Sequence, residues 1–227
     1  MINIEKAIVN AYLGNSKLNE QILALEGMSS SKVRHLLNNL AAEAKGYLEV
    51  GCWKGSTLIS ACYGNDCPAF AIDNFSEFDK EKTTEEILRS NISKFLSGKD
   101  VFFFNNDFME IAPENTEGSK IDLLLYDGSH SYKDQYNAIV HLTKFCEDEF
   151  VLVIDDWNHE PAKSGTIDAI NDCKEYGLVV HENYILPAKF NGDLDGWWNG
   201  VWVAKIHKLS EEKRRKDTAK RFLYGAT

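Results

Sequence analysis

Two apolar runs in this sequence end in side chains that can bind cations and move protons. The run IDLLLY (residues 121–126) is followed by Asp127 and His130 within D-G-S-H, and the run FVLVI (residues 150–154) is followed by Asp155 and Asp156. Apolar runs of this length predict buried strands. If the two strands are neighbours in a parallel sheet, their ends lie about 4.8 Å apart and bring the carboxylates and the imidazole together.

Three carboxylates at adjacent strand ends repel one another unless a cation lies between them. Ligation by oxygen alone favours Mg²⁺, Mn²⁺ or Ca²⁺ over zinc, so we expect Asp127, Asp155 and Asp156 to bind Mg²⁺. His130, with an ordinary pKa near ~6.5, can take up a proton at cellular pH. A structural interpretation stays open, in which Asp127 serves a turn, Asp155 or Asp156 caps the next helix, and His130 begins a helix at the surface.

A glycine-containing loop follows the run at residues 47–50. The stretch EVGCWKGST (residues 49–57) leads from a predicted strand into a predicted helix. Glycines allow a sharp turn and a close approach of a ligand, and the N-terminus of a helix offers free N–H groups. The G-x-x-x-G spacing matches neither the dinucleotide motif nor the phosphate-binding loop, so a plain tight turn is the alternative. Glu49 is costly to bury unless it is paired, for instance with a cationic ligand.

Acids also follow the second and third apolar runs. Asp73 ends AFAID (residues 69–73), where an acid can accept both hydroxyls of a ribose. Asp107 follows FFFNN (residues 102–106), where it can receive an adenine amino group. Each acid also has a structural interpretation, as a turn residue or as the N-cap of a short helix.

The order of the predicted elements indicates an α/β fold. Five short apolar runs alternate with stretches of helical spacing, which is typical of a parallel sheet covered by helices on both faces. Right-handed crossovers then favour a doubly wound fold. Two further strand-like runs, 178–186 and 201–206, have no helix between them. We therefore expect a mostly parallel seven-stranded sheet that ends in an antiparallel C-terminal hairpin.

The first 45 residues form a predicted helical N-terminal extension (1–45) in front of the main domain (46–227). Val33, Leu36, Leu37 and Leu40 have helical spacing, and residues 29–31 supply serine N-caps. The extension is expected to form a lid over the ligand or a contact in a homodimer, and the sequence does not choose between the two.

Composition excludes several classes of protein. The chain has 227 residues, enough for one substantial core, and has no apolar run near the roughly 20 residues of a membrane span. It also lacks a signal-peptide pattern, so a cytoplasmic location is expected. The formal charge of −10 disfavours binding to nucleic acid, and acids flank the one basic stretch at residues 213–216. The five cysteines form no C-x-x-C pair and are expected to be reduced.

With these residues in view, the sequence resembles the class I S-adenosylmethionine-dependent methyltransferases. The resemblance is carried by E-V-G-x-x-x-G-S-T, the acid at Asp73 and the N-D pair at 106–107, and it extends from residue 46 to about residue 206. It implies a Rossmann-like methyltransferase fold, with the loop at the methionine part of the cofactor, Asp73 at the ribose and Asp107 at the adenine. The implied cofactor-binding residues are Glu49, Gly51, Cys52, Trp53, Gly55, Ser56, Thr57, Asp73, Asn74, Asn106, Asp107, Phe108 and Asp127.

The D-G-S-H-S-Y segment and the acid pair at 155–156 are similar to the metal-dependent O-methyltransferases of the macrocin (macrolide-sugar) type. This resemblance implies that Asp127, Asp155 and Asp156 bind Mg²⁺ and that His130 is the catalytic residue that removes the substrate proton. Catechol-type relatives have Asp-Asn at the second position and lack this histidine.

We therefore expect methyl transfer from S-adenosylmethionine to a hydroxyl of a small molecule. A metal-independent methyltransferase of the same fold, and a non-catalytic protein for ligand binding or assembly, are the alternatives. Trp197, Trp198 and Asn199 are expected to line the substrate cleft, because an aromatic ring stacks on a flat or sugar-like acceptor.

Overall fold

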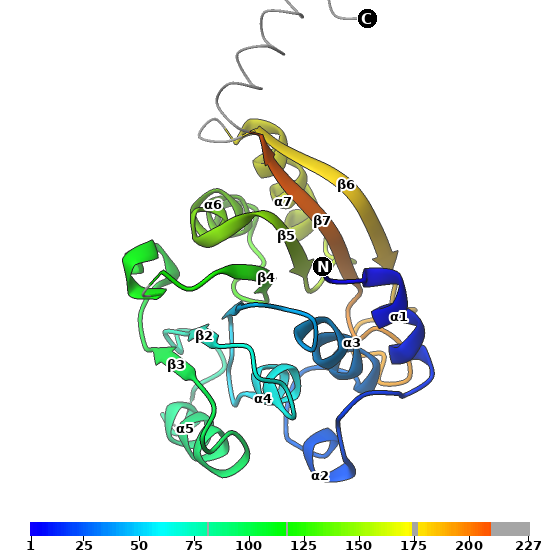
Figure 1. Ribbon diagram of the computed structural model, residues 1–227, viewed down its shortest axis with the longest axis vertical. Helices are drawn as coiled ribbons and strands as arrows, with labels where there is room; N and C mark the ends of the chain where they lie inside the picture. Colours follow the sequence, from blue (N-terminus) through cyan, green and yellow to red (C-terminus); the bar gives the residue numbers. More distant parts are fainter. Residues whose placement is uncertain (81, 117, 174–176, 210–227) are drawn as a thin grey trace, which may run out of the picture.

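The computed structural model describes residues 1–80, 82–116, 118–173 and 177–209, which form one seven-stranded sheet with helices on both faces (Figure 1). The strand order is β3-β2-β1-β4-β5-β7-β6. Neighbouring strands from β3 to β5 are parallel, whereas β7 runs antiparallel to both β5 and β6. The strands are β1 (Tyr47–Val50), β2 (Ala69–Ile72), β3 (Val101–Phe104), β4 (Ile121–Tyr126), β5 (Cys146–Ile154), β6 (Gly177–Leu186) and β7 (Val201–Leu209).

This arrangement confirms the predicted doubly wound sheet and its antiparallel C-terminal hairpin. The bounds of β1 to β4 agree with the apolar runs, whereas β5 begins four residues before its run, at Cys146, and β7 extends to Leu209. Every residue of β1, β2 and β4 is buried. A strand without a solvent-facing side is mostly apolar, and the exceptions in these strands are the buried acids Glu49 and Asp122.

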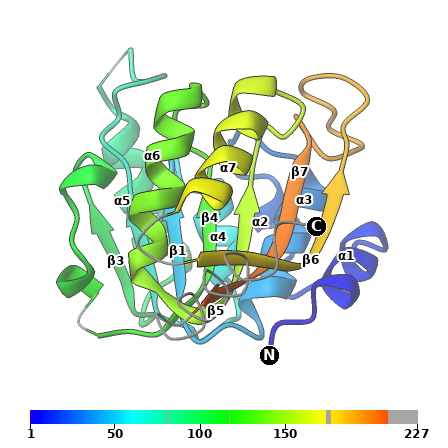
Figure 2. The ribbon, with the colours of Figure 1, turned by 90° about the horizontal axis from the view of Figure 1, so that it is seen from above.

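Alternate residues along each central strand supply two separate cores. Tyr47 of β1 and Leu123 of β4 face one core, and Leu48 and Leu124 face the other. The first core is covered by α1 (Ile4–Tyr12), α2 (Glu20–Leu23), α3 (Ser31–Ala41), α4 (Ser56–Cys62) and α5 (Thr84–Phe95). The second is covered by α6 (Tyr132–Leu142) and α7 (Glu160–Asp172), which lie together on one side of the sheet in Figure 2.

The N-terminal segment is helical, as predicted, and its apolar side chains enter the first core. Leu36, Leu37 and Leu40 of α3 are fully buried there. The helix begins after Ser30, whose hydroxyl accepts a hydrogen bond from the N–H of Val33 at 3.3 Å. The proposed role of this segment as a lid or a dimer contact stays a prediction.

Two expectations concern the remainder of the chain. None of the helices that the structure describes is long and apolar enough to cross a membrane. The basic stretch at residues 213–216 lies outside the described residues.

The sheet reverses its strand order between β1 and β4, and Gly51 lies at this switch point. Its φ of +90° suits glycine. A Cβ atom at this position would lie 1.9 Å from the carbonyl oxygen of Asp127. The N–H of Asp127 in turn donates to the carbonyl of Val50 at 2.8 Å. The glycine is therefore required by the backbone of β4 as well as by any ligand.

We expect Gly51→Ala to destabilise the fold severely, because the added methyl group meets backbone that cannot move without separating β1 from β4. Gly98 is a matched control, since its φ is +78° and no atom lies within 4 Å of an added Cβ. In urea unfolding, the free energy of unfolding should fall by at least about 2 kcal/mol more for Gly51→Ala than for Gly98→Ala. Equal losses would mean that only the backbone conformation matters at Gly51.

Candidate active site

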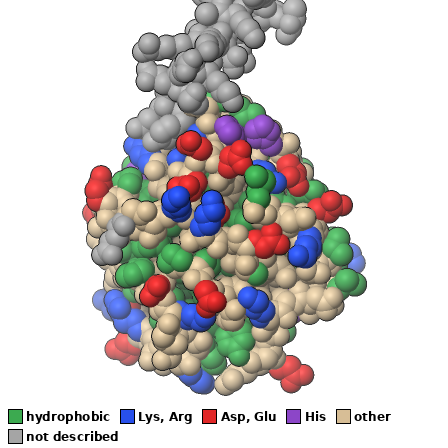
Figure 3. Space-filling model, viewed as in Figure 1, with side chains coloured by type: hydrophobic (Ala, Val, Ile, Leu, Met, Phe, Trp, Pro, Cys, Tyr) green, Lys and Arg blue, Asp and Glu red, His purple; other side chains and the backbone are tan. Residues whose placement is uncertain are grey.

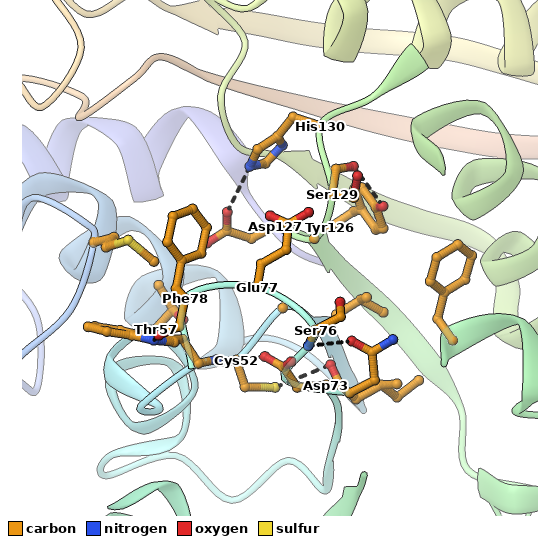
Figure 4. Close-up of a pocket in the computed structure, with 18 of the residues that line it drawn as sticks. Cys52, Thr57, Asp73, Ser76, Glu77, Phe78, Tyr126, Asp127, Ser129 and His130 are labelled. Carbon is orange, nitrogen blue, oxygen red and sulfur yellow. Dashed lines mark hydrogen bonds and ion pairs between the residues drawn. The ribbon is translucent and has the colours of Figure 1, made fainter. Parts of the chain in front are cut away.

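A cavity of about 400 Å³ opens at the carboxyl ends of the central strands (Figure 4). This is within the usual range for a pocket that holds a drug-sized ligand. Its position is the one expected for ligands of doubly wound sheets. Most of the site residues predicted from the sequence line it: Gly51, Cys52, Trp53, Ser56, Thr57, Asp73, Asn74, Asn106, Asp107, Phe108, Asp127, His130 and Asp156.

Three predicted residues are not part of the cavity lining. Glu49 and Asp155 are buried behind it, with 0% and 5% of their surface exposed. Gly55 is the N-cap of α4 and has a φ of +88°. A Cβ atom there would lie 2.6 Å from the side chain of Leu88, so this glycine allows α5 to pack against the loop.

Asp73 holds the glycine loop in place from the end of β2. One carboxylate oxygen accepts from the N–H of Trp53 at 2.7 Å, and the other accepts from the N–H of Phe75 at 2.8 Å. Trp53 has a φ of +44°, which is unusual for a residue with a side chain. A carboxylate has about four acceptor positions, so Asp73 can bind these amides and still accept the hydroxyls of a ribose.

Asp107 caps the short 3-10 helix Phe108–Glu110, accepting from the N–H of Met109 at 2.9 Å. The structural interpretation of this residue is therefore correct. Asp107 nevertheless lines the cavity together with Asn106 and Phe108, so its free oxygen is available to a ligand.

Glu49 is fully buried, and its partners are hydroxyl groups. Tyr47 donates to one carboxylate oxygen at 2.5 Å, and Thr57 donates to the other at 2.6 Å. Because Thr57 belongs to the first turn of α4, this contact links the middle of β1 to the helix that follows the loop. Burial raises the pKa of Glu49 from 4.5 to about 7, and the hydrogen bonds from Thr57 and Tyr47 oppose that rise.

The acids and the histidine at the ends of β4 and β5 lie together, as the sequence predicts. The Nε2 atom of His130 is 3.1 Å from Oδ2 of Asp156 and 3.8 Å from Oδ1 of Asp127. Asp155 lies close enough to Asp127 for its charge to raise the pKa of Asp127. Asp156 has a φ of +54°, a strained conformation of the kind that clusters at functional sites. The N-cap of α7 is His159, so neither acid caps that helix.

Burial and mutual repulsion favour the protonated forms of these acids. Burial, and then the charges of Asp155 and Asp156, raises the pKa of Asp127 well above its ordinary value. Burial and the charge of Asp156 raise the pKa of Asp155 to about 8. For His130, burial lowers the pKa and the charge of Asp156 opposes this.

The cluster has the chemical character of a cation site, although its side chains pair with each other. Oδ1 of Asp155 is buried and has no hydrogen-bond partner. Within the described residues, no three His, Cys, Asp or Glu side chains are arranged as the ligands of one metal ion. A cation here would therefore require positions of these side chains that differ from those in the structure.

Sequence reasoning missed part of the wall and was wrong about one tryptophan. Trp198 and Asn199 line the cavity as predicted, whereas Trp197 is buried and its Nε1–H donates to the hydroxyl of Tyr12 at 3.0 Å. A tryptophan is as often a core residue as a binding residue, and the sequence alone does not distinguish them. The cavity-lining residues that were not predicted as ligand-binding are Met28, Val50, Ile72, Ser76, Glu77, Phe78, Tyr126, Gly128, Ser129 and Asp134.

Comparison with known proteins identifies the domain that carries this cavity. Residues 48–157, slightly less than half of the chain, match the family model described as "Methyltransferase domain". No curated protein matches the chain significantly.

Solved structures share the fold at low sequence identity. A putative O-methyltransferase from Klebsiella pneumoniae is 13% identical, with a TM-score of 0.56 and coverage of 90% of this chain and 89% of that one. The N-methyltransferase NodS from Bradyrhizobium japonicum, in complex with S-adenosyl-L-homocysteine, is 14% identical, with a TM-score of 0.55 and coverage of 88% and 100%. TrmN from Thermus thermophilus is 12% identical, with a TM-score of 0.55; the match covers 83% of this chain but about half (52%) of TrmN.

Residues 48–157 therefore match a methyltransferase domain, and the chain shares the Rossmann-like fold of solved methyltransferases. The structural neighbours include enzymes named for methylation of oxygen and of nitrogen, so the fold leaves the acceptor atom open.

The buried carboxyl of Glu49 predicts a pH-dependent stability. In the folded protein its pKa is about 7, whereas the ordinary value is 4.5. Between these pH values the folded state keeps a proton on Glu49 that the unfolded state releases. The contribution of Glu49 to the free energy of unfolding therefore falls as the pH rises from about 4.5 to about 7. The loss is on the order of 3 kcal/mol and is constant at higher pH.

Glu49→Gln removes this titration and keeps the size of the side chain. In urea unfolding, the variant should therefore gain stability relative to the wild type as the pH rises from 4.5 to 8. Subtracting the free energy of unfolding of the wild type from that of the variant at each pH removes the contributions of the other titrating groups. A difference that does not change with pH would contradict the raised pKa of Glu49.

Proposed function

We propose that this chain transfers a methyl group from S-adenosylmethionine to a hydroxyl of a small molecule, with a divalent cation bound by Asp127, Asp155 and Asp156. One observation carries the proposal. The ends of β4 and β5 place three carboxyl groups and the imidazole of His130 beside the cavity that the cofactor motifs line.

The reaction has simple requirements. The bond between sulfur and the methyl carbon breaks, a bond from the acceptor oxygen to that carbon forms, and S-adenosylhomocysteine leaves. The protein must align the oxygen, carbon and sulfur atoms and must accept the hydroxyl proton. Amine acceptors that are already neutral need no such base, and for this reason the acid and histidine group favours a hydroxyl over a nitrogen acceptor.

His130 is the proposed proton acceptor. Its Nε2 atom faces Asp156 and Asp127, while Nδ1 is buried without a hydrogen-bond partner. The positive charge of a protonated imidazole would be stabilised by the carboxylate of Asp156, 3.1 Å from Nε2. The histidine side chain is one-quarter exposed, which leaves it open to a bound acceptor.

The residues present fit a divalent cation because Asp155 carries a buried oxygen without a partner, and hard oxygen ligands suit Mg²⁺. When bound, the cation neutralises the carboxylates and lowers the pKa of an acceptor hydroxyl.

The metal is tested by comparing wild-type protein, Asp155→Asn and Asp148→Asn. Asp148 is an exposed acid near the opposite end of β5 and is the matched control. We expect Mg²⁺ to raise the melting temperature of the wild type and of Asp148→Asn but not of Asp155→Asn, since Asn removes the charge that binds the ion. EDTA should abolish methylation of small hydroxylated acceptors while S-adenosylhomocysteine still binds in calorimetry. Activity that survives both EDTA and Asp155→Asn would select the metal-independent enzyme.

His130→Gln tests the proton acceptor. Glutamine can still donate to Asp156 but cannot accept a proton at neutral pH. The turnover number should fall by roughly 10²-fold or more, and the dissociation constant for S-adenosylhomocysteine should not change. An unchanged rate would remove His130 from the mechanism. If neither cofactor nor product binds to the wild type, the protein is a non-catalytic one.

A further inference from the structure

Six acidic side chains line the cavity: Asp73, Glu77, Asp107, Asp127, Asp134 and Asp156. No Lys or Arg lines it in the part of the chain that the structure describes. An acceptor that carries a phosphate or a carboxylate would therefore find no Lys or Arg side chain to pair with among the described residues of this lining. The wall therefore favours a neutral or cationic acceptor.

Five of these acids already have partners within the protein. Asp73 and Asp107 accept backbone N–H groups, and Asp134 accepts the hydroxyls of Ser129 and Ser131. Asp156 and Asp127 both face His130, with Nε2 at 3.1 Å from the first and 3.8 Å from the second. Glu77 differs, because its carboxylate makes no hydrogen bond or ion pair with any described residue.

Glu77 is exposed, and the backbone on both sides of it is held by hydrogen bonds. The carbonyl of Phe78 accepts from Nε1–H of Trp53 at 3.3 Å. On the other side, the N–H of Ser76 donates to Asn74 at 3.1 Å. Figure 4 shows the Glu77 side chain extending from this loop toward Asp127 and Tyr126, with Phe78 beside it.

Aromatic rings accompany this carboxylate in the cavity wall. Phe78 is 68% exposed although it is apolar, and it lies at the cavity together with Trp198 from the connection between β6 and β7. A carboxylate and aromatic faces are the groups that bind an organic ammonium ion. The His130 side chain is near enough for the charge of Glu77 to act on it, so the subsite adjoins the proposed proton acceptor.

We propose that Glu77, with the rings of Phe78 and Trp198, forms an acceptor subsite that selects small hydroxylated molecules carrying a protonated amine. That the bound molecule is methylated on a hydroxyl rests on the proposed function. Recognition of its amine by Glu77 does not depend on the metal or on His130.

Calorimetry with two matched probes tests the subsite. Benzylammonium and benzyl alcohol are titrated into the full chain, with and without S-adenosylhomocysteine and without added metal. The wild type should bind benzylammonium at least fivefold more tightly, and 0.5 M NaCl should reduce this preference. Glu77→Gln should abolish the preference, and Glu77→Lys should reverse it.

Glu86→Gln is the matched control, because Glu86 is an exposed acid in the first turn of α5 and is outside the cavity lining. It should keep the preference of the wild type. Equal affinity for the two probes, no binding of the amine, or the same loss in Glu77→Gln and Glu86→Gln would overturn the proposal. Failure of S-adenosylhomocysteine to bind would instead overturn the proposed function, and the titrations without it still report on the subsite.

Discussion

The contact between the backbones of Gly51 and Asp127 is the constraint on which the site depends. It lies where the strand order reverses, and it leaves no room for a Cβ atom. On one side of this contact the chain turns into the loop and helix that resemble a cofactor site. On the other side it continues into the acid and histidine group. The glycine loop and the acid and histidine group therefore meet at one backbone contact. The packing of that backbone fixes the distance between them.

The fold and much of the cofactor side could be predicted because both follow from local patterns. Fully buried strands appear as uninterrupted apolar runs, and the residue after each run falls at the ligand-binding edge of the sheet. The part of the cavity wall that faces the glycine loop could not be predicted in this way. Met28, Glu77 and Trp198 come from three separate connections, and only tertiary packing brings them to one cavity. Trp197 and Trp198 are adjacent and chemically identical, so no sequence pattern indicates which one is buried.

Buried carboxyl groups give the site its electrostatic character. Glu49 and Asp155 are buried where water cannot stabilise a negative charge, so each favours its protonated form in the free protein. Burial and the charges of neighbouring acids also raise the pKa of Asp127, which lines the cavity. Cations that arrive with the cofactor, the metal or the acceptor would take the place of these protons. The same residues that weaken the free protein at higher pH would then favour binding of positively charged partners, since the cost of burying their charge is offset only in the complex.

The connection between β6 and β7 is attached to the N-terminal segment at several points. Ser30 donates to the carbonyl of Gly196 at 2.7 Å, Lys32 donates to the carbonyl of Asp195 at 2.5 Å, and Trp197 contacts Tyr12. Both segments lie outside residues 48–157, the stretch that matches the methyltransferase domain. Met28 of the N-terminal segment and Trp198 of this connection both line the cavity, so a substitution in either segment can change the cavity wall. The N-terminal segment also packs on the glycine loop, because Glu26 pairs with Lys54 at 2.5 Å and Gly27 lies against Ser56. A change in this segment can therefore affect the glycine loop and the opposite wall of the cavity together.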